Sequence, residues 1–421
     1  MVTATVAIVG LSVVGAGCGA GAGSVRAQAE RDRDSAAAVA SLQAAKFDDA
    51  ASQATQVLAR DAGNSRAAAV RAIATYQAAG SRLRDDLTSS GTKLLDRTTA
   101  VGIGQRFLDQ LAAVDRDLAV VAGDPAFSLE LCLACWEHDW NHNGRIDDGD
   151  RSLFEIEFDG RVAAGRNDGS GELAKDDPRR RPTFRFDTGD GDWARAMISF
   201  QRAVLEIALA YRWSEVAKLF VPSQRKDQSP TIVLHLEDAP RVQRARTLIL
   251  DGLRYADRCR TEYLAETDDT REWLPNPRQH DHAIPLEVDP ALYQTWADIT
   301  GDVRRLLESQ EAISIRELAA LGKRDSAAYF PDAYLDLGAM LREPADITLD
   351  VGLIEAADDS HRNPTVVATL LEKFLRGALG KGYAASGKRS PLPGRLQRMA
   401  GELSTGGDTL DRKLRYLLWL N

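Results

Sequence analysis

Residues 192–213 read DWARAMISFQRAVLEIALAYRW, and this stretch decides the fold class. Its large apolar side chains recur every three or four residues, at Trp193, Met197, Phe200, Val204, Ile207 and Tyr211. This spacing places them on one face of an α-helix. Asp192 has the chemistry of a helix N-cap. The stretch therefore predicts a long amphipathic helix with one buried side.

The same periodicity continues on both sides of this stretch. Towards the N-terminus, residues 103–122 carry Phe107, Leu111, Val114, Leu118 and Val121 on one helical face. Towards the C-terminus, the pattern predicts helices at residues 238–266, 289–308, 312–321, 331–342, 364–379 and 408–419. Residues 231–236 fit either a short strand or a buried connector. Because nearly every segment has helical spacing, we expect a mainly α protein, with residues 192–421 as its C-terminal helical region.

The composition is that of a folded globular protein. The chain has 421 residues, of which 44% are hydrophobic and 27% charged, so a disordered chain and a polytopic membrane protein are excluded. Basic residues number 53 and acidic residues 62, giving a net charge of −9. This balance argues against nucleic acid as the partner.

Residues 35–80 are rich in alanine and contain short helical hairpin signals. A small residue, an aromatic residue and a second small residue occur at Ala45, Phe47 and Ala50. Further along, Val57-Leu58 is followed by Asp61 and Asn64. This segment resembles a tetratricopeptide repeat (TPR), although Ala62 stands where that family has proline. The resemblance implies a TPR-like array of helical hairpins over residues 35–138, with a protein or peptide as partner. A plain Ala-rich hairpin is the alternative.

The N-terminus carries an apolar run, Val6–Val14, followed by small residues and Cys18. It resembles a bacterial lipoprotein signal, although no Lys or Arg precedes the run and Gly15 replaces the usual leucine. The resemblance implies a signal peptide at residues 1–17, lipidation of Cys18 and a flexible tether over residues 18–34. The absence of aspartate after Cys18 implies the periplasmic face of the outer membrane, with the lipid as the sole membrane contact. The alternative is a buried Gly-rich strand.

Three further cysteines are Cys132, Cys135 and Cys259. The CxxC pair is followed by Trp136, whereas haem attachment requires histidine at that position. Cys132 and Cys135 therefore fit a structural disulfide, two buried thiols or a redox-active pair. The sequence assigns Cys259 no partner.

Residues 139–192 differ in character, with 14 acidic and 9 basic residues and a net charge of −5. We expect residues 139–191 to form a polar insertion. Oxygen-bearing residues within it occupy positions 1, 3, 5, 9 and 12 of a twelve-residue loop, with glycine at position 6 and a backbone carbonyl at position 7. The side chains at positions 1, 3, 5, 9 and 12 are Asp139, Asn141, Asn143, Asp147 and Asp150. Arg145, at position 7, would be the sixth ligand through its carbonyl oxygen.

This loop resembles an EF-hand or dockerin calcium loop, which implies a Ca²⁺ site at these six residues. Trp140 at position 2 departs from the EF-hand pattern, and Asp150 replaces the usual glutamate. We expect a helix before the loop at residues 127–138, a short helix after Arg151, and Ile146 as an apolar anchor. The alternative is a polar turn that binds no metal.

A second acidic group, Asp187, Asp190 and Asp192, fits either a turn with a helix cap or a metal site. With the histidines of the chain, including His280 and His282, it could form a metal-dependent enzyme. No GxSxG, HExxH or P-loop pattern is present. The sequence therefore favours a calcium-binding cell-envelope lipoprotein with a scaffold role over this enzyme.

Overall fold

The computed structural model describes residues 22–90, 96–157, 172–213, 231–267, 271–279, 282–284, 290–320, 333–350, 374–385 and 387–403. The predicted signal peptide, Cys18, His280 and the helix expected at residues 408–419 lie outside these ranges. The described chain is mainly α-helical, which confirms the predicted fold class. None of its helices is long and apolar enough to cross a membrane.

The N-terminal part is a run of four helices, α1 (Ala22–Gln43), α2 (Phe47–Arg60), α3 (Ser65–Ser90) and α4 (Arg97–Val121). Asn64 starts α3, because its Oδ1 accepts the Ala67 N–H at 2.9 Å. Residues 22–34 belong to α1, so the flexible tether predicted over residues 18–34 is wrong for them. The repeated alanines explain the helix, since alanine has the best helix propensity.

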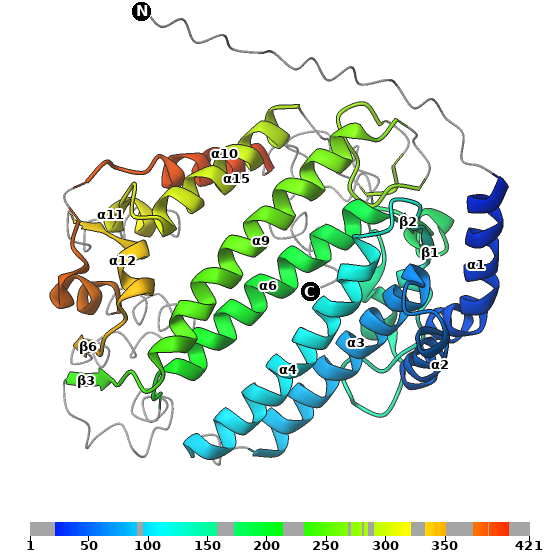
Figure 1. The fold of residues 1–421 in the computed structure, drawn as a ribbon, viewed down its shortest axis with the longest axis horizontal. Coiled ribbons are helices and arrows are strands. Elements are labelled where there is room, and N and C mark those ends of the chain that lie inside the picture. The colour runs from blue at the N-terminus through cyan, green and yellow to red at the C-terminus, as the bar shows by residue number, and fades with distance from the viewer. Residues whose placement is uncertain are drawn as a thin grey trace, which may run out of the picture.

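Two long helices, α6 (Thr188–Ala210) and α9 (Ala239–Ala265), form the centre of the molecule. Figure 1 shows α3, α4, α6 and α9 lying side by side with their long axes roughly aligned. Helix α6 starts four residues earlier than Asp192, because Asp187 is its N-cap and Asp190 completes a capping box. Asp238 caps α9, so the helix predicted over residues 238–266 is confirmed.

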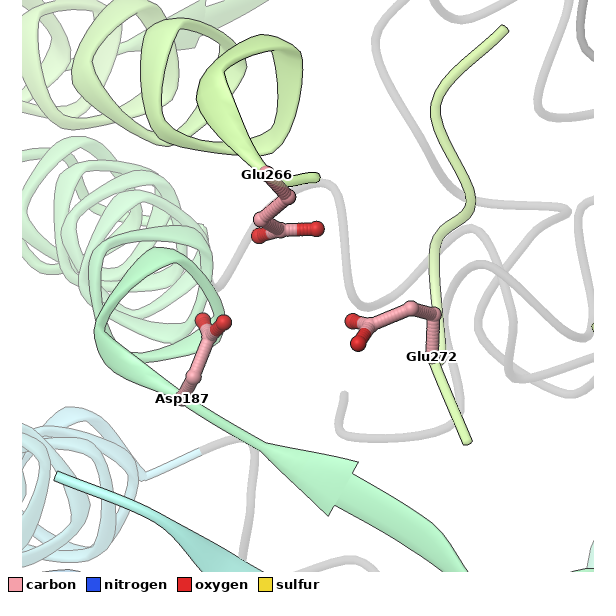
Figure 2. A group of neighbouring side chains, drawn as sticks. All are labelled: Asp187, Glu266 and Glu272. Carbon is pink, nitrogen blue, oxygen red and sulfur yellow. The ribbon is translucent and has the colours of Figure 1, made fainter. Parts of the chain in front are cut away.

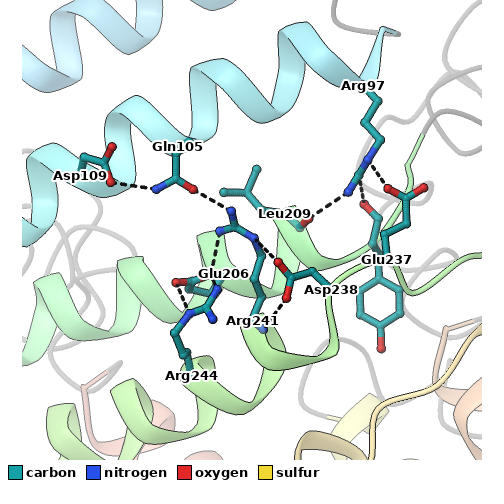
Figure 3. A network of polar contacts seen from close by, with 10 residues as sticks. Arg97, Gln105, Asp109, Glu206, Leu209, Glu237, Asp238, Arg241 and Arg244 are labelled. Atoms are coloured by element: carbon teal, nitrogen blue, oxygen red, sulfur yellow. Dashed lines mark hydrogen bonds and ion pairs between the residues drawn. The ribbon is translucent and has the colours of Figure 1, made fainter.

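A network of polar side chains joins α4, α6 and α9 at one end (Figure 3). Arg241 of α9 donates to Glu206 of α6 at 2.8 Å and to Gln105 of α4 at 2.7 Å. Arg97 of α4 donates to the Tyr211 carbonyl oxygen at 3.0 Å and pairs with Glu237. The network thus satisfies the carboxylate of Glu206, which is 6% exposed, and holds the three helices at a fixed offset.

A pair of antiparallel strands brackets residues 132–183, which include most of the polar insertion. Strand β1 (Leu129–Leu131) pairs with β2 (Phe184–Phe186), in the register Leu129 with Phe186 and Leu131 with Phe184. The helix predicted at residues 127–138 is therefore wrong. Buried and exposed side chains alternate in β1, a period of two that favours a strand, and only a 3₁₀ turn, η2 (Leu133–Cys135), follows it.

Smaller elements complete the C-terminal part. These are helices α10 (Pro290–Leu307), α11 (Ile315–Ala320), α12 (Leu337–Arg342) and α15 (Leu392–Leu403), and a π-helical turn, η7 (Leu379–Tyr383). Strand β3 (Thr231–Leu234) pairs with β6 (Ile347–Asp350), and β4 (Ile313–Ser314) pairs with β5 (Tyr334–Leu335). Residues 231–234 thus form a strand, and the helix predicted over residues 331–342 is shortened to α12 by β5.

Candidate functional site

The loop at residues 139–150 is held by its own polar side chains. The Asp139 carboxylate accepts the N–H groups of Asn143 at 3.0 Å and Gly144 at 2.7 Å. Asn141 Oδ1 accepts the Asn143 N–H, and Asn143 Oδ1 accepts the Arg145 N–H, each at 2.9 Å. Gly144 has φ +83°, a left-handed conformation that glycine adopts without strain. The first half of the loop is therefore a tight turn lined by side-chain oxygens.

Asp150 closes the loop on itself. This side chain is 3% exposed, and its Oδ1 accepts the N–H groups of Trp140 at 2.9 Å and Asn141 at 3.1 Å. Its Oδ2 accepts the Asp147 N–H at 3.0 Å. Position 12 thus reaches back to positions 2, 3 and 9.

Asp147 is both a loop residue and the start of the next helix. It caps α5 (Asp148–Arg151), which continues into the 3₁₀ turn η3 (Ser152–Phe154), as expected after the loop. A hydrogen bond from the Asn143 amide at 2.8 Å lowers the pKa of the Asp147 carboxyl, and backbone N–H groups add to this effect. Asp147 therefore stays ionised, which a calcium ligand requires.

The structure brings five of the six predicted ligands into one hydrogen-bonded turn, the sixth being the Arg145 carbonyl. Their chemistry, carboxylate, amide and carbonyl oxygens in a glycine-containing loop, fits Ca²⁺. Two flanking expectations fail: a strand and a 3₁₀ turn precede the loop instead of a helix, and Ile146 is 39% exposed rather than anchored.

Trp140 anchors the loop to the helical body. Its ring lies 5.9 Å from that of Phe47 in α2 and 5.4 Å from that of Phe154 in η3, measured between centroids. Trp136 contacts the rings of Phe47, Trp140 and Phe154. On the other side, Arg84 of α3 donates to the Trp140 carbonyl oxygen. The tryptophan that departs from the EF-hand pattern is thus the side chain that attaches the loop to α2 and η3.

A disulfide joins Cys132 and Cys135 directly before this aromatic group. Cys135 is exposed, whereas Leu133 and Ala134 between the two cysteines are 1% and 6% exposed. Cys259 is a free, buried cysteine, and burial raises the pKa of its thiol well above the usual value.

The residues Asp187, Asp190 and Asp192 do not converge on one point. The Asp190 carboxylate accepts the Tyr263 hydroxyl at 2.6 Å and the Asp187 N–H at 2.9 Å. Asp192 is fully buried and pairs with Arg258 at 2.6 Å. Asp190 therefore serves to cap α6, and the buried Asp192 forms an ion pair.

Asp187 instead faces two glutamates that sequence reasoning missed. Asp187, Glu266 and Glu272 offer carboxylate oxygens that all lie within 4.8 Å of one another. Figure 2 shows the three side chains pointing toward one another from the start of α6, the end of α9 and the segment at residues 271–279. We call these three residues the carboxylate cluster.

The carboxylate cluster disfavours negative charge on Glu266. Burial, together with repulsion from Asp187 and Glu272, raises the pKa of Glu266 to about 9. Glu272 is 3% exposed and accepts from Arg185 at 2.7 Å, which compensates part of the charge. A shared proton or a divalent cation would relieve the remaining repulsion.

The described histidines lie elsewhere. His282 Nδ1 is 2.7 Å from the Ile284 carbonyl oxygen, and His235 Nδ1 is 3.1 Å from Asp346. His138 and His142 flank or lie within the calcium-type loop, and burial is the main cause that lowers the pKa of His138. Within the residues that the structure describes, the enzyme hypothesis therefore lacks the histidines that it assigned to Asp187, Asp190 and Asp192.

Comparison with known proteins places the chain in no group: no family model, no curated protein and no solved structure matches it.

Proposed function

We propose that this chain is a calcium-binding lipoprotein of the cell envelope, anchored through Cys18 to the periplasmic face of the outer membrane, with a protein-binding scaffold role. The observation that carries the proposal is the loop at residues 139–150. There, the side chains at positions 1, 3, 5, 9 and 12 are joined by hydrogen bonds around a glycine turn.

The surroundings of the loop favour a bracing role for the ion. Trp140 packs against Phe47 of α2, and His142 Nδ1 lies 3.5 Å from Asp85 of α3. Calcium bound between Asp139 and Asp150 would fix the segment that makes both contacts. The ion would then stabilise the junction between the polar segment and the N-terminal helices.

The N-terminal helices supply the proposed binding surface. Small side chains at Ala50, Ala54, Ala67 and Ala68 are fully buried, so α2 and α3 approach closely, as TPR hairpins do. A TPR-like array of this kind offers an extended face to a peptide or a helix. The enzyme alternative is weaker, because Asp190 and Asp192 are already engaged by Tyr263 and Arg258.

Calorimetric titration of the metal-stripped full chain tests the calcium site. We expect heat of binding with a Kd of roughly 10⁻⁴–10⁻³ M, the range of extracellular modules. Asp139→Asn should weaken binding by about tenfold or more, because it removes a ligand charge. Asp148→Asn is the matched control: it removes the same charge from the same loop, at a side chain that is 87% exposed and occupies no ligand position. Absence of heat in the wild type, or equal loss in both variants, would refute the calcium site.

A further inference from the structure

The Cys132–Cys135 disulfide lies at the surface, on a turn that other contacts hold in place. Cys135 is exposed and Cys132 is half-buried. The two residues between them point into the apolar core, where Leu133 and Ala134 are 1% and 6% exposed. The sulfur-bearing residues and the anchoring residues of this turn are therefore different residues.

The backbone of the turn has its own hydrogen bonds. The Cys135 N–H donates to the Cys132 carbonyl oxygen at 3.1 Å, and the Trp136 N–H donates to the Leu133 carbonyl oxygen at 3.2 Å. Trp136, the next residue, is 3% exposed and contacts Phe47. Strand β1 fixes the other side of the turn through its pairing with β2. Hence burial, hydrogen bonds and strand pairing hold the turn in addition to the S–S bond.

The disulfide closes a very short loop. A cross-link stabilises a protein mainly by restricting the unfolded chain, and this effect falls as the loop shortens. A disulfide between two cysteines only three positions apart therefore contributes less to the stability of the fold than one that closes a long loop. Their Cα atoms are 5.2 Å apart, within the range for a disulfide, so two thiols held there remain close enough to reoxidise.

Both thiols of the reduced pair would have a hydrogen-bonding partner. Cys132 Sγ lies 3.6 Å from the Arg181 carbonyl oxygen, which can accept a hydrogen bond from the thiol. Cys135 faces solvent. Neither sulfur would be left as an unpaired buried group after reduction.

From these contacts we propose that Cys132 and Cys135 form a site of reversible thiol–disulfide exchange whose partner is a dithiol protein of the thioredoxin type. The partner thiolate attacks the exposed Cys135 sulfur, the S–S bond breaks, and Cys132 leaves as a thiolate that takes up a proton. The second partner thiol loses its proton and attacks the mixed disulfide. This step releases Cys135 as a thiolate, which is protonated, and leaves the partner oxidised. Two electrons and two protons pass from the partner dithiol to the pair, and the reverse sequence restores the disulfide.

The test uses the folded full chain in buffer with millimolar reduced glutathione, followed by alkylation and peptide mapping of each cysteine. Structural disulfides resist the glutathione pool, whereas exchange-active ones are reduced by it. We expect both Cys132 and Cys135 to become alkylated, and oxidised glutathione to reverse the reduction. Cys259 is the internal control, because it is fully buried and reports unfolding.

Labelling of the pair should be at least about 100-fold faster than labelling of Cys259, since access controls the reaction. A pair that stays oxidised would overturn the proposal. Labelling of all three cysteines at one rate would overturn it too, because exchange would then require unfolding. In a second measurement, thioredoxin that lacks its resolving cysteine should be trapped on Cys135. Trapping on Cys132 instead, or no trapping, would contradict the assigned point of attack.

Discussion

Glu266 is a carboxylate placed where a helix disfavours negative charge. It is the C-cap of α9, at the negative end of the helix dipole, and Asp187 and Glu272 face it. Asp187, by contrast, caps the positive end of α6. Glu266 is therefore the group of the carboxylate cluster expected to retain a proton.

This arrangement predicts a pH dependence of stability. The pKa of Glu266 is about 9 in the folded chain and near 4.5, the ordinary value for glutamate, when unfolded, so the folded state binds the proton more tightly. Its contribution to stability is fully present below pH 4.5 and is lost as pH rises towards about 9. Glu266→Gln should therefore be as stable as the wild type near pH 4 and more stable at pH 8, by urea unfolding in the presence of a chelator.

The control for this prediction is Glu308→Gln, an exposed glutamate just after α10. Its stability relative to the wild type should not change between the two pH values. A Glu266→Gln variant that loses stability at pH 8 would show that its charged form makes a favourable contact.

At the scale of the single site, the sequence predicts a site only where its residues lie close together along the chain. The calcium-type loop was recognisable because all its ligand positions fall within residues 139–150. The carboxylate cluster was not, because Glu266 reaches Asp187 only through the packing of α6 and α9, and Glu272 only through contacts of the segment at residues 271–279 with β2. No local spacing encodes that contact, and the nearby Asp190 and Asp192 suggested a different group.

At the scale of elements, helix packing depends on close approach at a few glycines. A Cβ added to Gly252 of α9 would lie 2.6 Å from the Phe200 ring of α6, and this glycine is buried. Gly80 of α3 is exposed, and a Cβ there would meet nothing within 4 Å. Both glycines lie within long helices, but only Gly252 is packed against a neighbouring helix.

We expect Gly252→Ala and Gly80→Ala to change stability in opposite directions. Gly252→Ala should destabilise by about 1–3 kcal/mol, because the aromatic ring must move. Gly80→Ala should stabilise by about 0.5–1 kcal/mol, because alanine is the better helix former. Urea unfolding measures both, and a neutral or stabilising Gly252→Ala would contradict the tight crossing of α6 and α9.

Helix boundaries also show which elements the sequence determines locally. Asp238 caps a helix whose position was predicted, because a capping residue and apolar spacing agree there. Residues 127–138 were wrongly predicted as helical, since Leu129 and Leu131 pair with β2, a partner more than fifty residues away. A short strand of this kind exists only through its partner.

At the scale of the whole molecule, calcium should raise the melting temperature. A ligand that binds only the folded state stabilises by mass action, about 1.4 kcal/mol at ten times Kd. In a chain of this size, the shift should be a few degrees at most. Differential scanning calorimetry with and without calcium measures it. At the same calcium concentration, Asp139→Asn should reduce the shift, whereas Asp148→Asn should keep it, and equal shifts in both variants would mean that calcium acts elsewhere.

Lipid anchoring makes a second prediction at this scale. Cys18→Ser should abolish labelling by a radioactive or clickable fatty acid and release the protein from the membrane fraction. The expected result follows from the loss of the lipid, which is the proposed membrane contact. Unchanged membrane association of the variant would refute the anchor. Cys259→Ser, a substitution of a buried cysteine, should leave the labelling intact.

The side-by-side order of the long helices has a consequence for how the chain assembles. From α1 to α4, and then through α6 and α9, each long helix packs against the one before it, so most of these contacts join near neighbours in sequence. Local contacts form quickly, because little loop entropy is lost before they are made. A chain delivered N-terminus first could thus add one helix at a time to a growing stack. The β3–β6 pair joins residues 231–234 to residues 347–350, so it must wait until the last third of the chain has arrived.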